Sequence, residues 1–257
     1  MTFAASLRSE FLKINRTSVI YLMLIAAFII PFVQLFDYDS PYPGNPVNGW
    51  DDFYKEGFMV FAFVFLPLFF VLASTLLMQM EVKNNAWKQV LASPQSFFHI
   101  LLAKFIALQV LAIAFLLIFN VYTAMSAGVI DIQFGLDFLA YLDRWPELLK
   151  LNLLAYGSTF GISGLGFWLA VRSKNFIVPV AIGFSLWLIC LAALEVKWPH
   201  IDKYVFGLPF TIVSKKYEHE HLLHQLLSIG YGMFFFGVAY FEFVLQRTPL
   251  SSLWRKR

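Results

Sequence analysis

Charged residues are scarce in this sequence. They make up 14% of the 257 residues, whereas 60% of the residues are hydrophobic and 30 are Phe. A soluble chain of this size could not bury so many large apolar side chains, because much of its surface would remain in water. The composition therefore excludes an ordinary soluble domain and indicates an integral membrane protein.

Cysteine is almost absent as well. The single Cys190 lies inside an apolar run, which excludes a disulfide within the chain and a cysteine-based metal site and favours a packing role for the thiol. Three histidines, His219, His221 and His224, stand close together among glutamates. Only His221 and His224 would share a helix face, and no firm ligand spacing supports a metal site. We therefore expect a solvated loop there and no bound metal.

Long apolar runs are what the sequence has in abundance. About 20 apolar residues cross a bilayer as a helix. Six windows approach or reach that length: Ser18–Phe36, Gly57–Met80, Phe98–Met125, Leu148–Val171, Phe176–Leu194 and Leu222–Leu245. Five spans are the main alternative, because Lys104 and a polar cluster at residues 218–224 intrude on the third and sixth windows. The predicted fold is all-α, with six transmembrane helices.

Lys, Arg, Asp and Glu are nearly missing from these windows. Those present, Lys104, Lys150 and Glu242, fall near window ends, where a long side chain can reach the headgroups. The deeper polar groups are neutral: Asn120, Tyr122, Asn152, Tyr156, Thr159 and Ser185. An ion-coupled transporter would keep an ionisable residue at mid-depth. We therefore predict a weakly polar, aromatic pathway, suited to an amphipathic or hydrophobic molecule.

Glycines are concentrated in the fourth window. Gly157, Gly161, Gly164 and Gly166 alternate there with Ser158, Thr159 and Ser163. The Gly-x-x-x-Gly spacing allows close backbone approach between helices. The partner helix is either in the same chain or in a second copy, and Ser228 and Gly232 form a weaker version of the pattern in the sixth window.

The Lys and Arg content of the short loops sets the membrane orientation. With both termini in the cytoplasm, twelve of the 19 Lys and Arg residues lie on the cytoplasmic side. Thirteen of the 16 acidic residues then lie in the three outer loops. We therefore expect both termini to be cytoplasmic.

The outer loops contain few regular patterns. Prolines and glycines in residues 37–56 favour turns, with Trp50 and Tyr54 at headgroup level. The apolar piece Val205–Ser214 contains Gly207 and Pro209 and is too short to span. We predict that it is interfacial or re-entrant.

Two elements are predicted on the cytoplasmic side. Apolar residues recur at helical spacing in residues 1–16 while the charged residues lie off that face, as in an amphipathic helix lying in the membrane interface. The insert Glu81–Ser96 (EVKNNAWKQVLASPQS) has a helix-like pattern that ends at Pro94. We predict a short transverse helix there, named the 81–96 insert below.

Together these features resemble the membrane subunit of an ABC-2 type exporter. The resemblance rests on the N-terminal segment SLRSEFLKINR, six spans, the motif E-x-K-N-N-A-W-K-Q-V-L-A-S-P, Lys104 early in the next span, and the broken apolar piece before the last span. Within that group, the chain looks most like the small permeases of lantibiotic and bacitracin self-protection transporters. The resemblance implies one permease domain over residues 1–257 in a bacterial cytoplasmic (inner) membrane.

The resemblance also implies partners. The 81–96 insert would be the coupling helix that docks into a cytoplasmic ATPase, through Glu81, Lys83, Asn84, Asn85, Trp87, Lys88, Val90, Leu91 and Pro94. The sequence has no G-x-x-x-x-G-K-[ST] loop, so ATP and Mg would bind to a separate chain. A second permease chain, identical or related, would complete the pathway, and no nucleic acid partner is expected. The pathway or helix-packing residues would be Asn120, Tyr122, Asn152, Tyr156, Gly157, Thr159, Gly161, Ser163 and Ser185.

Two other classes stay open. For the insert, the alternative is a loop helix that merely seals two spans. For the chain, one alternative class is a non-transporting membrane scaffold or sensor. An intramembrane enzyme is the least favoured class, because paired catalytic aspartates would have to lie within the spans and every Asp lies outside the windows.

Overall fold

The computed structural model describes residues 3–14, 17–37, 49–83, 96–134, 145–173, 175–212 and 214–247. All regular structure in these ranges is helical. Six of the described helices are long and apolar enough to cross a membrane. The predicted fold class is therefore confirmed.

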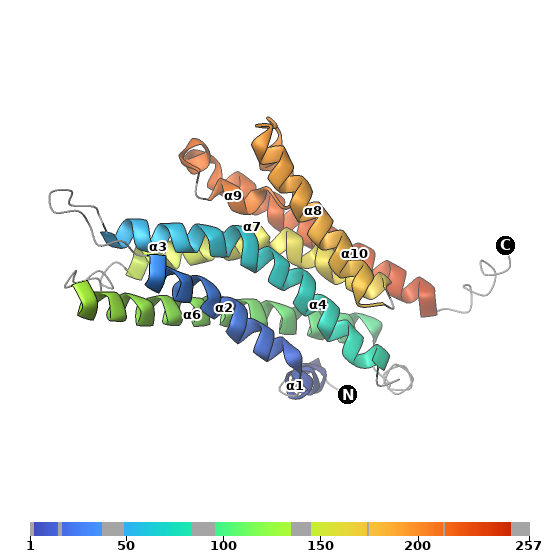
Figure 1. Ribbon diagram of the computed structural model, residues 1–257. Coiled ribbons are helices and arrows are strands. Elements are labelled where there is room, and N and C mark those ends of the chain that lie inside the picture. Colours follow the sequence, from blue (N-terminus) through green and yellow to red (C-terminus); the bar gives the residue numbers. More distant parts are fainter. Residues whose placement is uncertain are drawn as a thin grey trace.

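Helix α1 (Phe3–Ile14) precedes the spans and is amphipathic, as expected. The spans are α2 (Ser18–Asp37), the continuous unit α3 (Gly49–Val60), η1 (Phe61–Phe65) and α4 (Leu66–Lys83), then α6 (Phe97–Phe134), α7 (Trp145–Arg172), α8 (Ile177–Glu195) and α10 (His221–Arg247). Successive spans run in opposite directions, so that α1, the end of α4, the start of α6 and the end of α10 lie at one end of the bundle (Figure 1).

Three spans extend three or more residues beyond their predicted windows. The expectation that residues 37–56 form only turns is wrong for residues 49–56, which begin α3. Helix α6 continues nine residues past Met125, to Phe134, and α7 begins three residues before Leu148. A helix can continue into polar sequence beyond its apolar stretch, because its hydrogen bonds join backbone groups and do not require apolar side chains.

Aromatic side chains fill the middle of the bundle. The rings of Phe61 and Phe119 stack with centroids 3.9 Å apart, and Phe69 and Phe115 stack at 4.4 Å. These residues belong to η1, α4 and α6, so the cluster joins the second span to the third. Aromatic pairs of this kind add to the burial of their apolar area.

The second span changes its helical geometry at η1, a single π-helical turn. Pro67 lies two residues after this turn and has no N–H to donate to a preceding carbonyl. The indole N–H of Trp187 in α8 donates to the Phe63 carbonyl at 3.0 Å. A neighbouring span therefore supplies a hydrogen bond to the backbone of the π-helical turn.

The chain between α8 and α10 folds back into the bundle. It contains η3 (Ile201–Lys203), the one-turn helix α9 (Leu208–Thr211) and η4 (Lys215–Glu220). Leu208 and Thr211 are buried, and α9 contacts α7, α10 and η1. The short apolar piece is therefore packed inside the bundle, in agreement with the re-entrant alternative.

Candidate functional site

Most of the 81–96 insert lies outside the described residues. Asn84, Asn85, Trp87, Lys88, Val90, Leu91 and Pro94 fall in that gap, whereas Glu81 and Lys83 belong to the backbone of the last turn of α4. The described helix ends on either side of the gap lie at the same end of the bundle as α1 (Figure 1). The insert thus starts and finishes at that end of the bundle.

A buried ion pair attaches α1 to the third span. Lys104 Nζ donates to Glu10 Oε2 at 2.8 Å, and Lys13 Nζ donates to Glu10 Oε1 at 2.7 Å. Lys104 is 0% and Glu10 5% exposed. Burial by itself would raise the pKa of Glu10, but the two ammonium groups outweigh it and lower that pKa below its ordinary value. The expectation that Lys104 reaches the headgroups is wrong, because its charge is neutralised inside the protein.

A second carboxylate joins the last span to the fourth. Glu242 of α10 accepts a hydrogen bond from the Trp168 indole at 2.7 Å and from Arg172 Nη1 at 3.0 Å. Arg172 is largely exposed and lies over the Trp168 ring, 5.7 Å from its centroid. Glu242 was expected to extend to the headgroups, but it is instead held by two side chains of α7.

The deep polar residues form two separate clusters. In the first, the Tyr54 hydroxyl donates to Asn120 Oδ1 at 2.7 Å, and Asn120 Nδ2 donates to Asn152 Oδ1 at 2.8 Å. Both amides also donate to carbonyls of their own helices, those of Leu116 and Leu148. Tyr54 is 3% exposed, so its ring faces the bundle, and its place at headgroup level stays a prediction. The structure brings the two predicted asparagines together and adds a tyrosine from α3.

The second cluster lies between α6 and α7. The Tyr156 hydroxyl donates to Gln109 Oε1 at 3.0 Å, and Gln109 Nε2 donates to Ser163 Oγ at 3.0 Å. Ser163 in turn donates to the Phe160 carbonyl at 2.6 Å. Sequence reasoning singled out Tyr156 and Ser163 but missed Gln109, an amide well inside the third window that should have been counted among the deep polar groups.

The other predicted pathway residues are scattered. Thr159 donates to the Ala155 carbonyl of its own helix at 2.8 Å. The ring of Tyr122 packs edge-on against Phe28 of α2, with centroids 5.4 Å apart. Ser185 lies on an exposed face of α8. The two hydrogen-bonded clusters therefore connect α3, α6 and α7. Thr159, Tyr122 and Ser185 belong to neither cluster.

The glycines of α7 pack against α10 of the same chain. The Gly161 N–H donates to Ser228 Oγ at 2.9 Å, and that hydroxyl donates to the Ser158 carbonyl at 2.8 Å. A Cβ atom on Gly164 would lie 2.6 Å from the Gly232 carbonyl oxygen. The sequence left open whether the partner of this glycine face is in the same chain or in a second copy. These contacts show that it is α10 of the same chain.

A cleft of about 540 Å³ lies between the first turns of α7 and α10. Its walls include Trp145, Leu149 and Leu153, and Lys150 supplies one positive charge. Gln225 also lines it, but its amide N–H donates to the Leu154 carbonyl at 2.7 Å. An apolar wall with one cation matches an amphipathic ligand better than a bare ion.

Residues 6–190 match the model of a family described as ABC-2 family transporter protein. The matched range covers more than two-thirds of the chain, from α1 to α8. This chain belongs to the ABC-2 transporter family. It is a membrane permease of an ABC transporter and a transport subunit. Searches of curated proteins and of solved structures give no match.

The family match places most of the described contacts within the shared permease region. The Glu10–Lys104 pair and both deep polar clusters fall inside residues 6–190, as does the 81–96 insert. The re-entrant segment, residues 196–220, and α10 lie beyond the matched range. The family match therefore covers the part of the permease that includes the insert. The C-terminal part is described by its fold alone.

Proposed function

We propose that this permease is the membrane-spanning subunit of an ATP-driven exporter that moves or extracts an amphipathic or hydrophobic compound. Its membership of the ABC-2 family is the observation that carries the proposal. A peptide, a lipid-like molecule or a lipophilic drug fits the chemistry of the described spans, because their deep polar groups are neutral and hydrogen-bonded to one another. The apolar cleft with Lys150 supports the same class of cargo.

The energy for transport would come from a separate cytoplasmic ATPase that binds ATP and Mg. The 81–96 insert is the proposed contact, with Trp87, Val90 and Leu91 as an apolar centre and Glu81, Lys83 and Lys88 around it. Such a centre with a charged rim is the usual composition of a protein interface. The attachment of α1 to the third span through Glu10 and Lys104 supports the proposal, because it stiffens the end of the bundle at which the described helices flanking the insert end and begin.

The remaining parts of the assembly follow from the same proposal. A second permease chain, identical or related, would pair with this one in the bacterial cytoplasmic membrane. Both termini would face the cytoplasm, in keeping with the twelve Lys and Arg residues counted on that side. Exposed apolar residues on α2, α8 and α10 leave surface for lipid and for the second chain.

Affinity purification of the tagged full-length chain from its own cells tests the proposal. We expect an ABC ATPase to copurify, and deletion of the gene to raise sensitivity to membrane-active peptides or lipophilic toxins. A scaffold or sensor would purify without an ATPase. Unchanged toxin sensitivity together with altered sodium or proton tolerance would contradict the proposed cargo.

A further inference from the structure

His224 lies in the first turn of α10 with its ring almost completely buried. It is 2% exposed, and neither ring nitrogen has a hydrogen-bond partner among the described residues. Buried polar atoms in folded proteins are nearly always paired, so an exception needs a physical explanation. The explanation lies in the groups that surround the ring.

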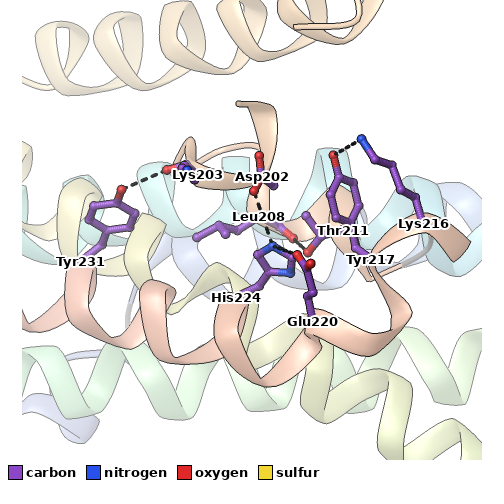
Figure 2. Close-up of polar contacts among 9 residues, drawn as sticks. All are labelled: Asp202, Lys203, Leu208, Thr211, Lys216, Tyr217, Glu220, His224 and Tyr231. Atoms are coloured by element: carbon purple, nitrogen blue, oxygen red, sulfur yellow. Dashed lines mark hydrogen bonds and ion pairs between the residues drawn. The ribbon is translucent and has the colours of Figure 1, made fainter. Parts of the chain in front are cut away.

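Two carboxylates point at the same ring nitrogen. Asp202 Oδ2 of η3 and Glu220 Oε2 at the end of η4 each lie 3.9 Å from His224 Nε2. Figure 2 shows the two side chains approaching the ring from different segments. Asp202 is largely buried and Glu220 is half-exposed. At 3.9 Å neither contact is a hydrogen bond, but each is an attractive ion pair once the imidazole carries a charge.

The other polar groups near the ring are already engaged or face away. The Thr211 hydroxyl donates to the Leu208 carbonyl at 2.7 Å, and Lys216 Nζ donates to the Tyr217 hydroxyl at 3.3 Å. The Tyr217 ring packs edge-on against His224, with centroids 5.4 Å apart. Other titratable or charged groups on the turns around the ring include Lys203 of η3, Lys215, Glu218 and His219 of η4, His221 of α10 and Lys150 of α7. The two carboxylates are therefore the groups that would respond to a charge on His224.

We propose that protonation of His224 closes a latch that holds the re-entrant segment, residues 196–220, onto α10. A protonated ring donates from Nε2, which has no hydrogen-bond partner among the described residues, and charge-assisted hydrogen bonds are shorter and stronger than neutral ones. Asp202 and Glu220 would move in to hydrogen-bond distance and bring η3 and η4 with them. Loss of the proton removes the charge and loosens both contacts.

The latch acts on the centre of the bundle through α9. This short helix lies between η3 and η4, and the ring of its Phe210 contacts Phe63 in the π-helical turn η1, with centroids 6.1 Å apart. Holding η3 and η4 therefore also holds α9 against the irregular part of the second span. The latch would thus regulate the contact between α9 and η1, a property that the proposed transport function does not include.

The sign of the pH dependence follows from the two kinds of group. Histidine changes charge between about pH 5 and 8, and carboxylates lose their charge below about pH 4. The latch is closed where histidine is protonated and the carboxylates are ionised, and it opens as the pH rises through the histidine range.

Hydrogen exchange of the purified full-length permease at pH 5.5 and pH 8.0 tests the latch. At each pH, His224→Gln is compared with the wild type, so that the intrinsic pH dependence of amide exchange cancels. We expect peptides from residues 196–220 to exchange about tenfold more slowly in the wild type at pH 5.5 and equally fast in both proteins at pH 8.0. Asp202→Asn should remove most of the difference, whereas the exposed His219→Gln should retain it.

Several results would overturn the proposal. One is equal exchange in wild type and His224→Gln at pH 5.5, and another is a loss of protection in His219→Gln as large as that in His224→Gln. If His224→Gln does not fold, the wild-type profile alone decides. The latch is refuted if the protection of residues 196–220, corrected for intrinsic exchange, is the same at the two pH values. Protection that EDTA removes and added zinc restores would assign the site to a metal ion instead of a proton. None of these readouts needs an ATPase or transport, so they are independent of the proposed function.

Discussion

At the scale of single residues, Lys104 and Glu10 are the clearest case of a charge placed by tertiary structure. They are separated by 94 positions in the chain and meet in a buried pair at 2.8 Å. A lysine at the edge of an apolar window is ordinarily expected to extend toward the headgroups. Here it turns inward, because α1 brings a carboxylate to it.

Removal of one partner should be costly at this pair. We expect Glu10→Ala to destabilise the permease by about 3–5 kcal/mol, since it removes one member of a buried ion pair whose other member, Lys104, is 0% exposed. The measurement is thermal unfolding of the detergent-solubilised protein at pH 7, where the lowered pKa of Glu10 keeps the carboxylate ionised. The matched control Lys13→Ala removes a partly exposed partner of the same carboxylate and should cost no more than about 1 kcal/mol. Equal losses in the two variants would show that Lys104 does not depend on Glu10.

The sequence predicts individual polar partners less well than it predicts spans. Asn120 and Asn152 were singled out because both lie deep in apolar windows, and they do meet. Gln109 could have been singled out on the same ground, but its contact with Tyr156 and the contact of Tyr54 with Asn120 could not be predicted, because the pairing of a polar side chain depends on which helix faces it. That information is distributed over helices separated by tens of residues, and no local pattern contains it.

At the scale of elements, the six spans were predictable because a bilayer requires about 20 apolar residues and few other segments meet that requirement. The ends of α3 and α6 were not, since helices continue into polar sequence where no apolar pattern marks them. The π-helical turn at Phe61–Phe65 was not predicted, because no apolar pattern distinguishes it from the α-helix on either side. Its stabilisation by Trp187 depends on a helix more than a hundred residues away.

The α7–α10 contact gives a prediction at this scale. Gly164→Ala should destabilise the permease by about 1–3 kcal/mol, because its Cβ would lie 2.6 Å from the backbone oxygen of Gly232 and one of the two helices must move. Gly237→Ala is the matched control on α10, since a Cβ there meets nothing within 4 Å. Thermal unfolding of both variants makes the comparison. A Gly164→Ala protein as stable as Gly237→Ala would mean that the two helices do not approach as closely as the structure has them.

At the scale of the whole molecule, the permease is polarised along the bundle. One end carries α1 with its buried ion pair, the Glu242 contacts with α7, and the two helices that flank the 81–96 insert. Towards the other end, a re-entrant segment reaches η1 through α9. The proposed roles follow this division, with ATPase contact at the first end and a proton-dependent latch on the re-entrant segment.

The measurement that tests the central claim most directly is ATPase retention by the purified permease with Trp87→Ala and Leu91→Ala combined. Truncating a large anchor side chain at the centre of an interface commonly costs about 2 kcal/mol or more. The double variant should therefore insert and fold normally, yet lose ATPase binding and transport, whereas the rim variants Glu81→Ala and Lys88→Ala should lose less. Loss of expression or increased protease sensitivity before any effect on ATPase binding would indicate that the insert only seals two spans. A well-folded double variant that retains ATPase binding and normal transport would contradict the coupling role.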